Sequence, residues 1–354
     1  MPNFEPVNKK NKKVYRKQSI AQSLFPCKGD STGEIIRKIV FLAAILVLIA
    51  ATFCVIYFYF IRSENINREM EDVKNMRGES NGSVISIPMH ITDSQGNTEE
   101  QHVEILQEYA ELYERNNDMV GWIEMYPWIG YPVLQTYDND FYLKHNFDKQ
   151  PTANGTIFAD YEIPITAESH PANTIIYGHN LITRNMFEPL SYFRTQGFEF
   201  MKENYRLNYD TIYKKNEYLI FAVFLTNTTE NLGEVFSYQN YVTFNSKSEF
   251  DGYVAECLDR SFYYTGIDLE YGDELLTLST CDFSMFSDMR LVVVARKVRD
   301  DESSVLDPET FIDNRGNDNE GNVKRKMFDA YYKSYGNQWA GRQWDTSWIK
   351  DFNQ

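Results

Sequence analysis

The sequence has little cysteine and lacks the motifs that are typical of metal and nucleotide sites. Only four of its 354 residues are cysteines, which is too few for a disulfide scaffold. It contains no paired CxxC and no HExxH motif, and it has neither a Walker loop nor a glycine-rich dinucleotide turn. We therefore expect that the protein uses no metal and no other cofactor.

The sequence is also short of basic residues. Its 35 Lys and Arg stand against 51 Asp and Glu, which gives a formal net charge of −16. Because binding to a phosphate backbone requires a basic surface, this balance argues against nucleic acid as a partner. Hydrophobic residues make up 43% of the chain, so it can bury a sizeable core and is not disordered as a whole. The length allows one large domain or two ordinary ones.

One long apolar segment indicates a membrane. Residues 39–61 contain no charged residue, no glycine and no proline, and about 20 apolar residues suffice to cross a bilayer as a helix. The segment is too long for the apolar part of a signal peptide, which spans about 7–15 residues. Residues 1–38 carry nine basic and three acidic side chains, so the positive-inside rule places this tail in the cytoplasm. We expect a single-pass protein of the cell membrane with everything after Arg62 outside.

The segment outside the membrane reads mainly as strands. A polar stalk over 62–97 is expected to lead into a helix from about Thr98, because Ile105, Tyr109 and Leu112 recur at helical spacing. Two further helices are expected near 186–196 and 247–262. Short apolar runs between turn residues predict a barrel or a sandwich. The expected strands are 120–124, 131–135, 155–159, 173–178, 207–213, 217–225, 274–280 and 290–298.

The chain after Arg299 differs in composition from the strands before it. It is first acidic, and the stretches DDESSVLDPET and DNRGNDNEGN look unstructured. It then becomes rich in tryptophan and tyrosine. We treat 300–354 as an extension that could pack on the domain or bind a partner, and the sequence does not separate these two roles.

The cysteines differ in the chemistry that their surroundings allow. Cys54 lies within the expected span and Cys27 on its cytoplasmic side, so neither can meet an external cysteine. Cys257 lies on the apolar face of an expected helix, where a buried and inert thiol is usual. Cys281 ends the strand TLSTC, where a partly exposed thiol can act as a nucleophile. By count alone, a bridge between Cys257 and Cys281 is also open.

A histidine and an arginine at other strand ends could assist this thiol. His179 follows the strand NTIIYG, whereas His145 in YLKHNF has the aromatic context of a packed histidine. Arg290 opens the strand RLVVVARKV and could stabilise an oxyanion. Arg296 shares its face but lies about 20 Å further along, at ~3.3 Å per residue. Taken alone, His179 is also compatible with a structural role and Arg290 with a solvated charge.

Together these motifs resemble a class B sortase, a membrane-anchored cysteine transpeptidase of mainly Gram-positive bacteria. The resemblance rests on TLSTC at 277–281, IIYGHN at 175–180 and the Arg290 strand, and it covers about residues 100–298. It implies a mainly β fold, an eight-stranded sortase β-barrel with an N-terminal helix and a helix between strands six and seven, here over 98–299. Further matching segments are NNDMVGWI (116–123), YPVLQ (131–135), DNDFYLKHNF (138–147) and GTIFADY (155–161).

The resemblance also implies a reaction and roles for the residues. Cys281 would attack the Thr carbonyl of an NP-x-T-x sorting motif near the C-terminus of a secreted protein, and form a thioester. Arg290 would stabilise the oxyanion, and His179 would protonate the leaving amine and deprotonate the incoming one. Ser279 and Thr280 flank the nucleophile and would line the substrate groove.

Some parts of this reading stay open. Asp282 or Asp288 could orient His179. The acceptor would be an amine of the cell wall, and the alternative is a pilus-polymerising enzyme whose acceptor is a pilin lysine. A third reading is a non-catalytic, membrane-tethered module that binds peptides, although the joint presence of Cys281, His179 and Arg290 argues against it.

Overall fold

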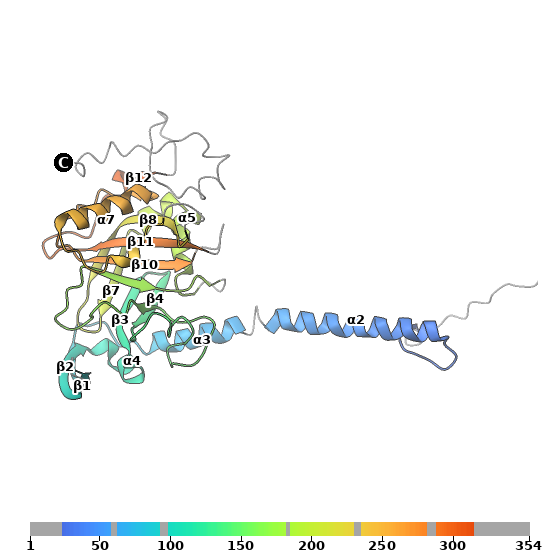
Figure 1. The fold of residues 1–354 in the computed structure, drawn as a ribbon. Coiled ribbons are helices and arrows are strands. Elements are labelled where there is room, and N and C mark those ends of the chain that lie inside the picture. Colours follow the sequence, from blue (N-terminus) through green and yellow to red (C-terminus); the bar gives the residue numbers. More distant parts are fainter. Residues whose placement is uncertain are drawn as a thin grey trace, which may run out of the picture. The chain divides into compact units, whose positions relative to one another are not determined.

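The computed structural model describes residues 23–57, 62–92, 98–181, 185–229, 235–281 and 288–314. The chain divides into two compact units, Met1–Arg68 and Glu69–Gln354. The first is dominated by one helix and the second by a β-barrel (Figure 1).

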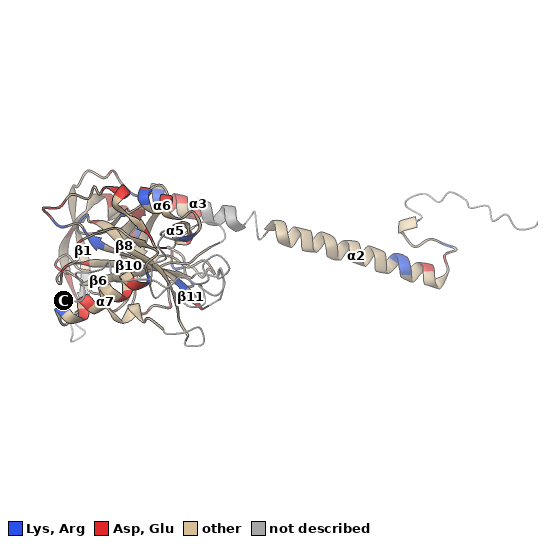
Figure 2. Ribbon diagram, turned by 90° about the horizontal axis from the view of Figure 1, so that it is seen from above, with Lys and Arg blue, Asp and Glu red and all other residues tan. Residues whose placement is uncertain are grey.

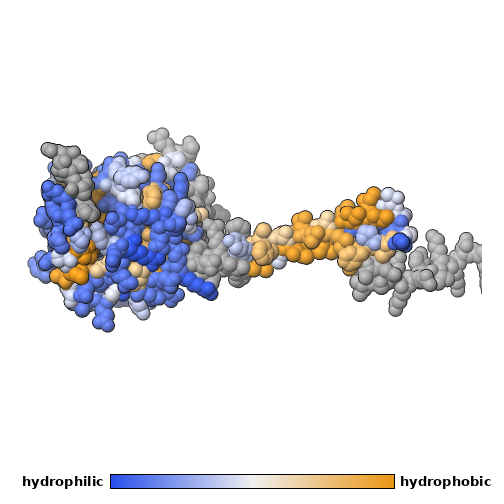
Figure 3. Space-filling model, turned by 90° about the horizontal axis from the view of Figure 1, so that it is seen from below, coloured by the Kyte–Doolittle hydropathy of each residue, from blue (hydrophilic) through white to orange (hydrophobic). Residues whose placement is uncertain are grey.

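The first unit contains α2 (Thr32–Ile56), which is long and apolar enough to cross a membrane. Its only charged residues lie in the first two turns, and the rest of the helix is apolar except for Thr52 (Figures 2 and 3). Ser31 caps the helix by accepting a hydrogen bond from the Glu34 backbone nitrogen at 3.3 Å. The helix therefore begins seven residues before the expected apolar segment, and residues 58–61 lie outside the described part.

The second unit is a closed barrel in the order β10–β11–β8–β7–β3–β4–β5–β6. All eight expected strands are present within a few residues of their predicted bounds, so the predicted eight-stranded barrel is confirmed. β6 and β10 run parallel, whereas β10 and β11 are antiparallel. The strands are β3 (Met119–Met125), β4 (Ile129–Leu134), β5 (Phe158–Ala159), β6 (Asn173–Tyr177), β7 (Arg206–Thr211), β8 (Glu217–Asn227), β10 (Leu275–Cys281) and β11 (Met289–Lys297).

The predicted helix between the sixth and seventh barrel strands is α7 (Lys247–Arg260). Ser246 caps it by accepting from the Glu249 backbone nitrogen at 3.2 Å. Its apolar face, including Tyr253 and Cys257, packs on side chains of β8, β10 and β11 in one buried cluster. The strands beneath α7 are consequently buried along almost their whole length, which is why they read as continuous apolar runs.

The predicted start of the helix at Thr98 is wrong. Residues Thr98–Leu106 form β2, which pairs antiparallel with β1 (Val84–Thr92), and helical structure begins only with η2 (Gln107–Tyr109) and α4 (Ala110–Arg115). The end of β2 and the following helix bury their apolar side chains in the same core cluster. The spacing of Ile105, Tyr109 and Leu112 is therefore the same as that expected for one longer helix.

Part of the segment expected to be a stalk also folds. α3 (Arg62–Asn75) buries Met70 and Val73, and β1 follows it. Residues 69–92 consequently belong to the same compact unit as the barrel.

Two other regions differ from expectation. The helix expected near 186–196 is divided into η3 (Glu188–Ser191) and α5 (Tyr192–Thr195), and α6 (Phe198–Glu203) follows. The start of the C-terminal extension, which looked unstructured, forms η6 (Pro308–Thr310) and β12 (Ile312–Asp313), which pairs with β9 (Tyr263–Tyr264). Residues 315–354, with the tryptophan-rich stretch, lie outside the described residues.

Candidate active site

The strand order brings Cys281, His179 and Arg290 to one end of the barrel. Cys281 is the last residue of β10 and lies directly opposite Arg290 in the antiparallel pair with β11. Because β6 runs parallel to β10, with Tyr177 opposite Ser279, its carboxyl end reaches the same edge, and His179 follows two residues later. All three residues line one cavity of about 320 Å³.

The backbone joins the two strand ends that carry the thiol and the imidazole. The Gly178 nitrogen donates to the Ser279 carbonyl oxygen at 3.1 Å, and the Asn180 Nδ2 donates to the Cys281 carbonyl oxygen at 2.8 Å. Cys281 is half-buried with a free thiol. Cys257 is fully buried on α7 and is also free, so the structure contains no bridge between them. Burial raises the pKa of the Cys257 thiol, as expected for an inert cysteine.

The His179 ring is contacted by the protein at two neighbouring atoms, Nε2 and Cδ2. Its Nε2 lies 2.9 Å from the Leu143 carbonyl oxygen. A carbonyl oxygen can only accept, so Nε2 carries the hydrogen and the neutral ring has its lone pair on Nδ1. Gly155, with a φ of +57°, packs against the adjacent ring carbon, and a Cβ there would lie 2.8 Å from His179 Cδ2 and 2.6 Å from the Tyr142 carbonyl oxygen. Glycine is therefore required at 155 by both the backbone conformation and the ring.

Arg290 and Arg296 have different surroundings although they share a strand. The half-buried Arg290 lines the cavity, and its Nη1 donates to the Met289 carbonyl oxygen at 2.9 Å. Arg296 is completely buried near the other end of β11, where its Nη2 lies 2.5 Å from Glu302 Oε1. The structure thus places Arg290, and not Arg296, beside Cys281.

Ser279 and Thr280, which precede Cys281, are both buried and both border the cavity. Ser279 shares the Cys281 face of β10, since side chains alternate along a strand, and its Oγ lies 2.6 Å from the Tyr238 hydroxyl. Thr280 points to the opposite face. Asp282 lies outside the described residues. Asp288 precedes β11, and its carbonyl oxygen accepts from the Thr228 backbone nitrogen at 2.9 Å.

Several cavity residues were not singled out from the sequence. Tyr177 could have been, because it is the last residue of β6 and stands two residues before His179. Asn139 and Leu143 come from the loop after β4, and Tyr238 comes from the connection before α7. No spacing in the sequence connects these loops to Cys281.

His145 and His170 lie in structural surroundings away from Cys281. His145 stacks on Phe141 with ring centroids 4.0 Å apart, which confirms the prediction of a packed histidine. His170 Nδ1 lies 2.7 Å from Glu274 Oε1 at the opposite end of the barrel. Within the described ranges, no three His, Cys, Asp or Glu side chains gather closely enough to hold a metal ion.

Comparison with known proteins identifies relatives of this chain. It is 34% identical over 180 residues to sortase B of Listeria monocytogenes, a match that covers 51% of this chain and 69% of the relative. It is 27% identical over 194 residues to sortase B of Staphylococcus aureus, covering 54% of this chain and 74% of the relative. No family model matches the chain.

Solved structures give the same result. Sortase B from Bacillus anthracis superposes with a TM-score of 0.52 at 27% identity, covering 68% of this chain and all of that chain. A cysteine-to-serine mutant form of Clostridium perfringens sortase B gives 0.51 at 26% identity, covering 66% and 98%. With a relative at 34% identity over more than two thirds of its length and a barrel of the same fold, the chain belongs to the class B sortases, a family of cysteine transpeptidases.

Proposed function

We propose that Cys281, His179 and Arg290 carry out the transpeptidation. The Cys281 thiolate attacks the carbonyl carbon of the scissile peptide bond, and the Arg290 guanidinium stabilises the oxyanion that forms. Protonated His179 gives its proton from Nδ1 to the leaving amine as the C–N bond breaks. The acyl group is then held as a thioester on Cys281.

The second half of the reaction reverses these roles. An incoming amine attacks the thioester carbonyl and loses its proton to the neutral His179, and the Cys281 thiolate leaves as the new amide forms. One observation carries the proposal: the direct pairing of Cys281 with Arg290 beside the parallel strand that ends at His179. It brings nucleophile, oxyanion donor and acid–base group around one cavity.

We infer that the substrate is a secreted protein with an NP-x-T-x sorting motif, cleaved after Thr, and that the acceptor is an amine of the cell wall. The apolar α2 would anchor the enzyme in the membrane. The basic residues before it would stay in the cytoplasm, with the barrel outside. An acidic exterior would favour approach of a cationic amine. This attraction applies equally to a pilin lysine, which remains the alternative acceptor.

The experiment is a transfer assay with the full-length chain in detergent micelles. Quenched peptides that carry NP-x-T-x motifs are offered with two acceptors, a short peptide with a free terminal amine and a lysine-containing pilin-like peptide. We expect cleavage after Thr and an amide product with the terminal amine, and neither with Cys281→Ala. Preference for the lysine acceptor would favour pilus assembly. Absence of cleavage with every motif would overturn the proposal.

A further inference from the structure

Asp160 is a buried carboxylate near the cavity that has no part in the proposed reaction. It follows β5 directly and is 5% exposed. Its Oδ2 accepts hydrogen bonds from the Tyr177 hydroxyl at 2.8 Å and from Asn139 Nδ2 at 2.9 Å, and its Oδ1 accepts from the Glu162 backbone nitrogen at 3.0 Å. Asn139 and Tyr177 both line the cavity that contains Cys281.

The backbone of Asp160 is fixed as firmly as its side chain. Its nitrogen donates to the Ile175 carbonyl oxygen on β6 at 2.9 Å, and its carbonyl oxygen accepts from Gln135 Nε2 at 2.7 Å. The carboxylate thus has a rigid base between the end of β4 and β6. A group held in this way can position a loop that it contacts.

The loop held by Asp160 carries the carbonyl group that orients His179. Within this loop Asp138 Oδ1 accepts from the Phe141 backbone nitrogen at 2.8 Å, and the Tyr142 carbonyl oxygen accepts from the Thr156 nitrogen at 2.9 Å. Leu143 follows, and its carbonyl oxygen meets His179 Nε2. Asp160 therefore reaches the imidazole through Asn139 and the 139–143 segment.

We propose that Asp160 is a positioning residue for His179. By fixing the 139–143 segment, it keeps the Leu143 carbonyl oxygen on Nε2 and leaves Nδ1 as the nitrogen that exchanges protons with the substrate. The inference rests on the proposed role of His179. Asp160→Ala leaves the partly buried donors of Tyr177 and Asn139 without their acceptor, and Asp160→Asn removes the negative charge that strengthens both bonds, so each variant loosens the loop.

The barrel contains a matched control for this site. Asp210 on β7 is also 5% exposed, and its Oδ2 accepts from the Tyr109 hydroxyl at 2.8 Å. This pair reproduces the Asp160–Tyr177 chemistry, but it borders a different cavity, lined among others by Arg77 and Lys215. Asp210→Asn should therefore cost stability without affecting His179.

The first readout needs no substrate. In the full-length chain in detergent micelles, with histidine labelled by nitrogen-15, a hydrogen-bonded His179 Nε2–H should exchange slowly and give an observable resonance, assigned by its loss in His179→Gln. We expect the resonance in the wild type and in Asp210→Asn, and its loss in Asp160→Asn and Asp160→Ala. Asn139→Ala, which breaks the loop side and keeps the carboxylate, should also lose it if Asp160 variants fail to fold.

The second readout is the transfer assay. We expect Asp160→Asn to lower kcat about 10- to 100-fold, the scale that misplacement of a reacting group costs. Asp210→Asn should keep kcat at the wild-type level at an equal loss in melting temperature. A retained resonance together with a kcat equal to that of Asp210→Asn would overturn the positioning role. A wild type without transfer would instead refute the proposed function, and the resonance would still test Asp160.

Discussion

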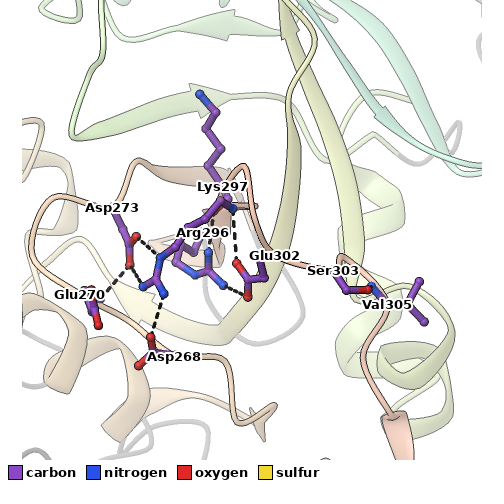
Figure 4. A network of polar contacts seen from close by, with 9 residues as sticks. Asp268, Glu270, Asp273, Arg296, Lys297, Glu302, Ser303 and Val305 are labelled. Atoms are coloured by element: carbon purple, nitrogen blue, oxygen red, sulfur yellow. Dashed lines mark hydrogen bonds and ion pairs between the residues drawn. The ribbon is translucent and has the colours of Figure 1, made fainter.

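The two ends of the β10–β11 pair serve different purposes. At one end, Cys281, Arg290 and His179 face a cavity. At the other end, charged side chains bind one another. Lys297 lies 3.0 Å from Glu274, and Arg299 lies 2.8 Å from Asp273 and 2.9 Å from Asp268. Arg296 pairs with Glu302 (Figure 4). The same two strands thus carry the proposed site residues Cys281 and Arg290 at one end and ion pairs at the other.

The carboxylates at the paired end, Glu274 and Glu302, both have a lowered pKa. Burial alone would raise the pKa of Glu274, but hydrogen bonds from His170 and Lys297 outweigh it and lower the pKa. A hydrogen bond from Arg296 lowers the pKa of Glu302. These carboxylates are held in their charged form and contribute to stability. From this difference we expect substitutions at the cavity end to change the rate of transpeptidation. Substitutions at the paired end should change the free energy of unfolding.

The largest expected effect is that of Cys281→Ala. We expect transfer to fall to background, because no other described cysteine lines the cavity. The side chain is small and only half-buried, so the free energy of unfolding should change by less than about 1 kcal/mol. Peptide cleavage and thermal unfolding measure the two quantities. Residual transfer well above background would show that the nucleophile lies elsewhere.

The two arginines of β11 give the next comparison. Arg290→Gln should lower kcat about 10²- to 10³-fold, as for loss of an oxyanion donor, with little loss of stability. Arg296→Met should do the reverse, because it removes the partner of Glu302, and should cost about 1–3 kcal/mol. Steady-state kinetics and urea unfolding of both variants test this. Equal effects of both variants on kcat would contradict the expected difference between the two ends.

Two glycines with positive φ extend the comparison. Gly155→Ala would place a Cβ 2.6 Å from the Tyr142 carbonyl oxygen and 2.8 Å from both the Leu143 carbonyl oxygen and the His179 ring. At Gly272, with φ +110°, no atom lies within 4 Å of the position that a Cβ would take. Gly272→Ala should cost about 1–2 kcal/mol in the left-handed region, and Gly155→Ala should cost more, because its Cβ would also meet two backbone carbonyl oxygens. Only Gly155→Ala should also lower kcat, by about tenfold, since it displaces the imidazole. An unchanged kcat in Gly155→Ala would mean that the ring position is unimportant.

The smallest effect is the pH dependence of stability. A carboxylate with a lowered pKa contributes stability that is present above its unfolded value, 4.5 for glutamate, and that is lost as pH falls through the folded value. The melting temperature of the wild type should therefore fall as the pH is lowered below about 4.5. The double variant Glu274→Gln with Glu302→Gln should show a shallower drop. Parallel curves would indicate that these pairs add nothing measurable.

The barrel was predictable because its strands are short runs of β-branched and aromatic residues. The site was predictable because Cys281, His179 and Arg290 lie at or next to strand ends. The start of the helix that was expected from Thr98 was not predictable. β2 pairs with β1, so its structure depends on a partner segment, whereas the spacing of Ile105, Tyr109 and Leu112 records only that all three are buried. Local periodicity cannot separate these two cases.

The surroundings of the site were predictable only in part. Tyr177 ends β6 two residues before His179, and alternation on β10 places Ser279, not Thr280, on the face of Cys281. The contacts of Asp160, Asn139 and Leu143 depend on the path of the loop after β4, and nothing in the spacing of these residues encodes that path. The loop that orients His179 could therefore be recognised only in the structure.

The central claim is that Cys281 forms the acyl-enzyme at this end of the barrel. Its most direct test is the intact mass of the full-length chain after incubation with a sorting peptide, followed by peptide mapping and then by addition of an amine. The account predicts one acyl group, located on the peptide that contains Cys281 and discharged by the amine. An adduct on another residue, or cleavage of the peptide with no adduct trapped on Cys281, would contradict it.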